Sequence, residues 1–156
     1  MRSIITVDVA PQKVIGLRRT GRYEDSGEMI REVFVCIREQ GISVTGPPAY
    51  ICHEESVAEV HKAQELGNAD IEVVFPVEGD AKGCGDITVY DLIGGKMARI
   101  IHMGPYPESV DTYNELFAWF KKNNYTLSGP IREVYINDPK TTEEDILVTW
   151  IYAPIS

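Results

Sequence analysis

The sequence has little that would support a metal centre, a disulfide framework or a membrane anchor. It contains only three cysteines, Cys36, Cys52 and Cys84, and none of them belongs to a CxxC pair. An odd number without that spacing argues against a disulfide framework or a zinc site and favours a reducing compartment. The first residues, MRSIITVDVAPQ, lack an apolar stretch long enough for a signal peptide. No run approaches the ~20 apolar residues of a membrane span, so we expect a cytoplasmic protein without membrane association.

Positive charge is also scarce. The chain has 15 basic against 24 acidic residues, for a formal net charge of −9. Binding to DNA or RNA would have to work against this charge, so we expect no direct nucleic-acid partner. With 156 residues, 44% of them hydrophobic and 25% charged, the composition is that of one globular domain rather than a disordered chain.

The most informative feature of the chain is an internal repeat. When the sequence is shifted by 83 residues, residues 4–55 align with 87–138 without a gap, and ten of the 52 pairs are identical. Ordinary composition would give roughly three identities. We therefore predict a single domain, residues 1–156, made of two similar halves at about 1–80 and 84–156 with a polar linker at 77–83.

Both halves show the same order of predicted elements. The first two strands of each half are separated by a short turn, so we predict that they form a hairpin. After Gly21 and Gly104, apolar residues recur at spacings of three and four, which indicates helices that end near Gly41 and Asn124. The predicted strands are 3–9, 13–20, 49–53 and 70–77 in the first half, and 86–92, 96–103, 131–136 and 145–152 in the second.

These elements predict an α+β fold with duplicated ββαββ halves and about eight mostly antiparallel strands. Each long helix has one apolar face, so both helices should pack on one face of the sheet. We expect a central cleft on the other face, at the seam between the halves. Strand alternation then predicts Val134 and Ile136 under the helices, and Glu133 and Tyr135 in the cleft.

Aromatic residues are expected to line the wall of this cleft. Tyr50 occupies the position equivalent to Glu133 in the first half. The last strand has two possible registers, and one of them brings Trp150 to the cleft, with Phe75 as its counterpart in the first half. A carboxylate among aromatic rings suits a lipophilic cation, since each ring face adds about 0.5–2 kcal/mol of cation–π attraction. The predicted ligand-binding residues are Glu133, Tyr135, Trp150, Tyr50 and Phe75.

Other interpretations of these residues stay open. Aromatic residues on strands more often serve packing than recognition, and a single Glu on a strand is often solvated or paired with a basic residue such as Arg132 or Lys140. A metal site at His53, Glu54, Glu55 and His61 is less favoured, because residues 54–69 read as a polar loop or short helix. We expect no metal and no cofactor.

Four stretches of the sequence carry a family resemblance: HMGPY at 102–106, GPIREVYINDP at 129–139, LVTWIYAPI at 147–155 and DIEVVFPV at 70–77. With these stretches the chain resembles the GyrI-like small-molecule-binding domain, the effector-binding domain of AraC-type and MerR-type transcription regulators. The resemblance covers essentially the whole chain, and residues 129–139 carry its most specific part. It implies a duplicated fold with a central cleft, in which Glu133 matches the acidic residue that contacts cationic, hydrophobic ligands and Tyr135 matches a cleft-lining position.

The resemblance also shapes the functional prediction. An acidic residue often stands in this family where the chain has Trp150, so a ligand that needs two carboxylates is in doubt. The first strand leaves no room for a preceding DNA-binding domain, so we expect a stand-alone binding protein for lipophilic cations, for multidrug-type sensing or sequestration. The alternatives are a hydrolase of reactive, cyclopropane-type electrophiles with Glu133 as general base, or a protein-binding module similar to the family's DNA gyrase inhibitor. We favour a binding protein over an enzyme.

Overall fold

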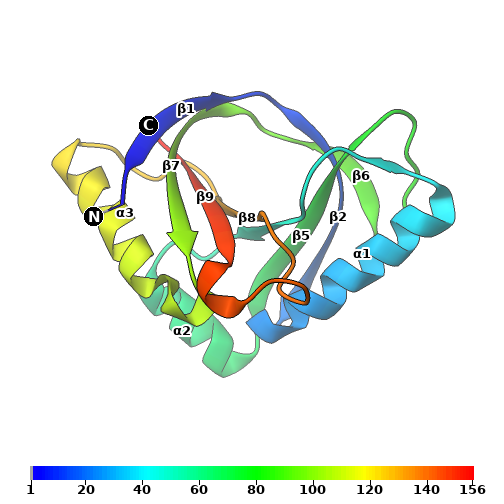
Figure 1. Cartoon of the computed structure of the whole chain (residues 1–156), viewed down its shortest axis with the longest axis horizontal. Coiled ribbons are helices and arrows are strands. Elements are labelled where there is room, and N and C mark those ends of the chain that lie inside the picture. The colour runs from blue at the N-terminus through cyan, green and yellow to red at the C-terminus, as the bar shows by residue number, and fades with distance from the viewer. Residues whose placement is uncertain (1) are drawn as a thin grey trace.

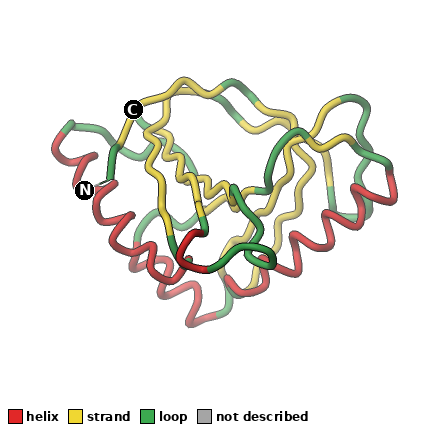
Figure 2. The backbone as a smooth tube through the Cα atoms, in the orientation of Figure 1, coloured by secondary structure: helices red, strands yellow, loops and turns green. Residues whose placement is uncertain are grey.

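A computed structural model describes residues 2–156, and within them nine strands form one curved antiparallel sheet (Figures 1 and 2). The strands are β1 (Ile4–Val9), β2 (Gln12–Gly21), β3 (Ser43–Val44), β4 (Ala49–Cys52), β5 (Ala69–Glu78), β6 (Thr88–Leu92), β7 (Gly95–Met103), β8 (Ile131–Tyr135) and β9 (Val148–Pro154). The α-helices are α1 (Ser26–Gln40), α2 (Val57–Leu66) and α3 (Val110–Lys122), and short 3-10 turns are η1 (Tyr23–Asp25), η2 (Tyr106–Ser109) and η3 (Glu144–Ile146). The sheet order is β1-β7-β9-β8-β4-β5-β2-β6, with β3 beside β5.

This architecture confirms the predicted α+β fold with two long helices. Both helices also end where the sequence predicted. Gly41 after α1 has φ 65° and Asn124 after α3 has φ 58°, which is the left-handed conformation that Gly and Asn tolerate best. The short helix within 54–69 is α2. The division of the chain into halves at about 1–80 and 84–156 stays a prediction, although the order strand, strand, long helix, strand occurs twice along it.

The two predicted hairpins were wrong, because the first strands are exchanged across the molecule. β1 pairs with β7, and β2 pairs with β5 and β6, so neither β1–β2 nor β6–β7 is a hairpin. In Figure 1 the chain passes from β1 over the top of the molecule to β2 on the far side. The β6–β7 connection crosses this one at Gly94, where a Cβ would collide with the Val9 carbonyl oxygen and the Pro11 nitrogen. Each of the two short turns is therefore part of a crossing between connections. The turn residues alone do not distinguish such a crossing from a hairpin.

A row of side chains that crosses the sheet shows which face the helices cover. Directly opposed residues on antiparallel strands point to the same side. α1 packs through Met29 and Val33, and α3 packs through Leu116 and Phe120, on the face that contains this row. Glu133 therefore lies on the helix-covered face. From one edge to the other the row reads Ile4, Ile100, Ile151, Glu133, Tyr50, Val73 and Leu17.

The prediction that Val134 lies under the helices and Glu133 on the opposite face was consequently wrong. Val134 packs on the other face, in a separate cluster with Val14, Ile51 and Val74. Tyr90 of β6 covers part of that cluster. Because both faces of the sheet bury apolar side chains, alternation within one strand could not tell which face the helices occupy.

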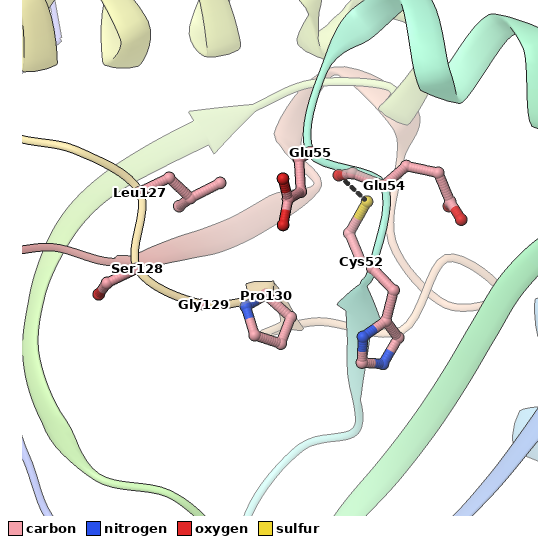
Figure 3. A pocket seen from close by; sticks show the side chains of 8 residues that line it. Cys52, Glu54, Glu55, Leu127, Ser128, Gly129 and Pro130 are labelled. Carbon is pink, nitrogen blue, oxygen red and sulfur yellow. Dashed lines mark hydrogen bonds between the residues drawn. The ribbon is translucent and has the colours of Figure 1, made fainter.

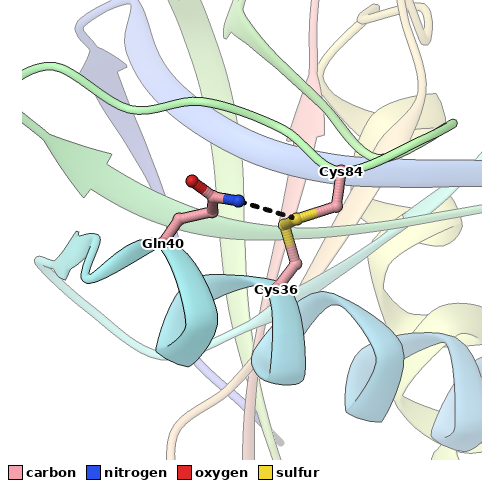
Figure 4. The surroundings of a disulfide bond; sticks show 3 residues. All are labelled: Cys36, Gln40 and Cys84. Atoms are coloured by element: carbon pink, nitrogen blue, oxygen red, sulfur yellow. Dashed lines mark hydrogen bonds between the residues drawn. A yellow bond between two sulfur atoms is a disulfide. The ribbon is translucent and has the colours of Figure 1, made fainter.

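The expectation that the cysteines form no disulfide was also wrong. Cys36 of α1 is bonded to Cys84, which lies between β5 and β6, and their Cα atoms are 6.1 Å apart (Figure 4). Cys36 is 2% exposed, and the Gln40 side-chain amide donates to the Cys84 sulfur at 3.7 Å. The bond ties α1 to the segment that leads into the second half. A separation of 48 residues gave no sign of this proximity in the sequence. No helix within residues 2–156 is both long and apolar enough to cross a membrane.

Candidate functional site

The centre of the helix-covered face is a carboxylate held by two tyrosines. Glu133 and Tyr135 are two residues apart on β8, and so they point to the same side. The Tyr135 hydroxyl donates to Glu133 Oε1 at 3.2 Å, and the Tyr113 hydroxyl from α3 donates to Oε2. The sheet and the helix above it thus both contribute a donor to the same carboxylate.

Further aromatic rings surround this group. Tyr50 of β4 lies directly opposite Glu133, and its ring packs edge-on against Tyr23 with centroids 6.2 Å apart. On the other side, the rings of Tyr106 and Tyr135 lie 5.0 Å apart. Tyr23 stands in η1 before α1, and Tyr106 stands in η2 before α3. The two turns that lead into the long helices therefore each place a tyrosine beside the central carboxylate.

The electrostatics of Glu133 are those of a desolvated acid. Burial raises the pKa of this carboxyl, while the hydrogen bonds from Tyr113 and Tyr135 partly oppose the rise. Burial, and after it the negative charge of Glu133, raise the pKa of both phenols well above the ordinary value. The ion pairs formed within residues 2–156 do not include Glu133. Within these residues, the two phenol hydroxyls and, more weakly, the nearby His102 oppose the rise of the Glu133 pKa.

Two nearby hydroxyl groups are buried without a hydrogen-bond partner among residues 2–156. They belong to Tyr50, opposite Glu133 on β4, and to Thr149, opposite Tyr135 on β9. Such orphaned groups are rare in protein interiors, because each costs about 1–3 kcal/mol when left unpaired. The centre of the site thus contains more polar atoms than its own residues satisfy.

A hollow of about 220 Å³ adjoins this centre (Figure 3). Cys52 belongs to its wall and also shares the sheet face of Tyr50 and Glu133. Burial, followed by the charge of Glu133, raises the pKa of the Cys52 thiol to about 12, so this thiol is a poor nucleophile. The hollow lies between residues 52–55, which follow β4, and residues 127–130, which precede β8.

The hollow is connected to the tyrosines through Glu54. Its carboxylate accepts a hydrogen bond from the Tyr23 hydroxyl at 2.5 Å and another from the Asp70 backbone N–H at 3.0 Å. Burial raises the pKa of Tyr23, and the hydrogen bond to Glu54 raises it further. The position of the Tyr23 ring beside Tyr50 is therefore fixed from the hollow side.

The structure brings together three of the five residues predicted for the site. Glu133, Tyr135 and Tyr50 are neighbours. Phe75 lies on the same sheet face but packs against Phe34 of α1, with centroids 6.2 Å apart. Trp150 lies on the opposite face, because the β8–β9 register pairs it with Val134 and pairs Ile151 with Glu133. Of the two registers left open for the last strand, the structure has the one that turns Trp150 away from Glu133.

Sequence reasoning missed three residues of this centre: Tyr23, Tyr106 and Tyr113. A signal for the first two was present, since Gly21-x-Tyr23 and Gly104-x-Tyr106 recur at the repeat spacing. Tyr113 follows the helical apolar pattern, and nothing local distinguishes its hydroxyl from that of a packing tyrosine. The repeat did point to Cys52 as a neighbour of Glu133, since Cys52 is the counterpart of Tyr135 in the first half.

Two histidines have structural partners, and one of them, His102, shares the sheet face of Glu133. His102 is 1% exposed and bonds Thr112 Oγ1 at 2.7 Å and the Pro105 carbonyl oxygen at 3.0 Å. His53 Nε2 lies 2.7 Å from Glu72 Oε1, on the face away from α1 and α3. In the part of the chain that the structure describes, no group of three or more His, Cys, Asp or Glu side chains is arranged to hold a metal ion.

A curved sheet with two long helices over an acidic, tyrosine-rich centre is an architecture suited to ligand binding. The chain belongs to the GyrI-like small-molecule-binding domain family, whose model matches residues 3–156. No curated protein matches the sequence.

Solved structures share the fold at low sequence identity. The C-terminal domain of EcmrR has a TM-score of 0.87 at 20% identity, over 100% of this chain and 98% of that chain. A hydrolase from Listeria innocua has a TM-score of 0.72 at 12% identity, over 99% and 92% of the two chains. SAV2435 bound to tetraphenylphosphonium has a TM-score of 0.55 at 15% identity, over 99% and 94%.

Proposed function

We propose that this domain binds lipophilic organic cations, with the Glu133 carboxylate as the counter-ion. The observation that carries the proposal is a partly buried carboxylate whose hydrogen-bond partners are two phenols, Tyr113 and Tyr135, and which forms no ion pair within residues 2–156. A buried charge without a counter-ion is costly. A cation that displaces water from the site would remove that cost.

The tyrosines account for the preference for lipophilic cations. Tyr23, Tyr50 and Tyr106 place rings beside the carboxylate, and each ring face that meets a cation contributes roughly 0.5–2 kcal/mol. Aromatic faces make few directional demands, so several cations of similar size would fit. The buried hydroxyl of Tyr50 would serve ligands that carry an acceptor.

The hollow beside Cys52 supports this location for a ligand. It has a volume of about 220 Å³, and Cys52 in its wall shares the sheet face of Glu133. The hollow is bordered by chain segments rather than by the long helices. The tetraphenylphosphonium bound to SAV2435, a protein of the same fold, is a lipophilic cation of the proposed class. The family description names small molecules as ligands.

The test is a pair of titrations with ligands of one shape and opposite charge, tetraphenylphosphonium and tetraphenylborate. Wild-type protein should bind the cation saturably and the anion not at all. Glu133→Gln keeps the size of the side chain but removes its charge, and it should weaken cation binding by about 1.5–3 kcal/mol, or roughly tenfold to a hundredfold. Glu65→Gln on α2, where Glu65 is exposed, makes the same chemical change away from the site and should bind like wild type.

Equal cation binding by wild type and Glu133→Gln would reject the proposed role of the carboxylate. The same variant addresses the hydrolase alternative, in which Glu133 activates a water molecule against a reactive electrophile. That alternative requires product formation that mass spectrometry detects and that Glu133→Gln abolishes. Binding of the cation without turnover of such electrophiles supports the binding function.

A further inference from the structure

A second cluster of charged and aromatic side chains lies on the sheet face that points away from α1 and α3. Arg99 of β7, Tyr152 of β9 and Arg132 of β8 are directly opposed across three neighbouring strands. Strand spacing separates the two arginine Cα atoms by about 10 Å, with Tyr152 between them. The three side chains therefore project from the same face of the sheet.

Neither arginine forms an ion pair within residues 2–156, although the charge of Glu72 acts on Arg132 from a distance. The ion pairs formed within residues 2–156 involve Arg2, Arg18, Arg19 and Arg31, but neither Arg99 nor Arg132. Glu72 lies in the same cross-strand row as Arg132 but two strands away. Its two oxygens already contact His53 Nε2 at 2.7 Å and the Tyr90 hydroxyl at 2.5 Å.

Arg132 is partly buried and makes a single hydrogen bond, from its guanidinium to the Ile93 carbonyl oxygen. Burial lowers the pKa of this guanidinium, since the charged form loses solvation. A guanidinium carries several N–H donors in a rigid fork, so most of its donors face no protein acceptor. A desolvated cation with free donors is unexpected in a chain of net charge −9.

An aromatic ring lies against the Arg99 guanidinium, which sits 4.7 Å from the centroid of the Trp150 ring. Trp150 and Tyr152 are partly buried and two residues apart on β9, so they point to the same side. Tyr152 lies directly opposite both arginines on the sheet. The Arg99 charge is therefore set against an aromatic ring, and a second aromatic residue stands between the two arginines.

We propose that this face binds a small organic carboxylate, whose oxygens accept hydrogen bonds from Arg99 and Arg132 and whose apolar body lies against Tyr152 and Trp150. The planar fork of each guanidinium matches a carboxylate. The aromatic surroundings favour a carboxylate with an apolar body over a strongly hydrated anion such as inorganic phosphate. The proposal is independent of the Glu133 site, which lies on the other face of the sheet.

The experiment uses benzoate as the probe and tryptophan fluorescence as the signal. The chain has two tryptophans, so Trp119→Phe leaves Trp150 as the only reporter, and binding is measured in that background. Benzoate should change the fluorescence saturably, and neutral benzamide should not. Arg132→Gln and Arg99→Gln should each weaken benzoate binding at least tenfold. Glu133→Gln should leave benzoate binding unchanged.

Arg38→Gln is the matched control, because Arg38 is an exposed residue in the last turn of α1 and the charge change is the same. Circular dichroism and thermal melting show whether each variant is folded, and two separate arginine variants keep the test decisive if one of them fails to fold. No saturable response to benzoate would overturn the proposal. Equal binding of benzamide, stronger binding of inorganic phosphate, or equal losses in Arg38→Gln and the two site variants would overturn it as well.

Discussion

Tyr50 and Glu133 are directly opposed on β4 and β8, and they are also 83 residues apart, which is the spacing of the sequence repeat. Tyr50 and Glu133 thus occupy equivalent positions of the repeat and also pair with each other. The repeat is therefore centred between β4 and β8. One position carries a carboxylate and the other a phenol, so the centre of the sheet carries one negative charge rather than two. The proposed preference for a cationic ligand rests on the asymmetry of this single pair.

The pH dependence of the domain's stability should report the burial of Glu133. Because the folded state raises the pKa of this carboxyl, Glu133 contributes stability that is fully present below its unfolded pKa and is lost as pH rises through the folded value. The free energy of unfolding of wild type, minus that of Glu133→Gln, should therefore decrease from pH ~4 towards neutrality. Urea denaturation at a series of pH values measures this difference. A difference that does not change with pH would contradict the assigned burial.

The Tyr113 hydroxyl should hold the pKa of Glu133 down. Tyr113→Phe keeps the ring and removes a donor to the carboxylate, so the pKa of Glu133 should rise further. The variant should also lose roughly 1–3 kcal/mol of stability. The carboxyl pKa can be read by NMR on protein labelled with ¹³C-glutamate. Tyr125→Phe is the control, since the Tyr125 hydroxyl contacts Lys96 and not Glu133, and an equal pKa change in both variants would contradict the assignment.

The disulfide should stabilise the domain. Cys36 and Cys84 close a loop with a sequence separation of 48 residues, and constraint of the unfolded chain by such a loop is worth about 2–4 kcal/mol. Cys84→Ser, or reduction of the wild type, should lower the free energy of unfolding by that amount in denaturant titrations. Reductant should have no further effect on Cys84→Ser. Identical stability of oxidised and reduced wild type would show that the bond does not constrain the chain.

The crossing of the β1–β2 and β6–β7 connections should depend on Gly94. A Cβ there meets backbone atoms of Val9, Ala10 and Pro11, which cannot move as a flexible side chain would. Gly94→Ala should destabilise the domain by more than about 1 kcal/mol, measured by thermal or urea unfolding. Gly27→Ala is the matched control, because a Cβ at Gly27 in α1 meets nothing within 4 Å and alanine favours the helix. Equal destabilisation by the two changes would contradict this account of the crossing.

Much of the fold followed from local patterns. The long helices, their ends at Gly41 and Asn124, and the general positions of the strands were predictable because period, capping and β-branched runs act over a few residues. The exchange of β1 and β6 could not be predicted, because a short turn is compatible both with a hairpin and with a crossing of two connections. The Cys36–Cys84 contact likewise depends on the three-dimensional path of the chain.

The candidate site was predicted in part for the same reason. Alternation along β8 grouped Glu133 with Tyr135 correctly, but it could not show that their face is the one beneath α1 and α3. The face on which Trp150 lies depends on the register between β8 and β9, which neither strand reveals alone. That register puts Trp150 on the face opposite Glu133 and Tyr135. Tyr113 reaches the carboxylate from a helix 20 positions away in the sequence, and only packing brings the two together.

The most direct test of the central claim is the pH dependence of tetraphenylphosphonium binding. If the Glu133 carboxylate is the counter-ion, wild-type affinity rises as pH passes through the raised pKa of Glu133 and levels off above it, and the affinity of Glu133→Gln is low and does not change with pH. Isothermal titration calorimetry in buffers of different ionisation enthalpy should also show proton release by wild type at the lower pH values. Wild-type affinity that stays constant across this range and matches that of Glu133→Gln would contradict the account.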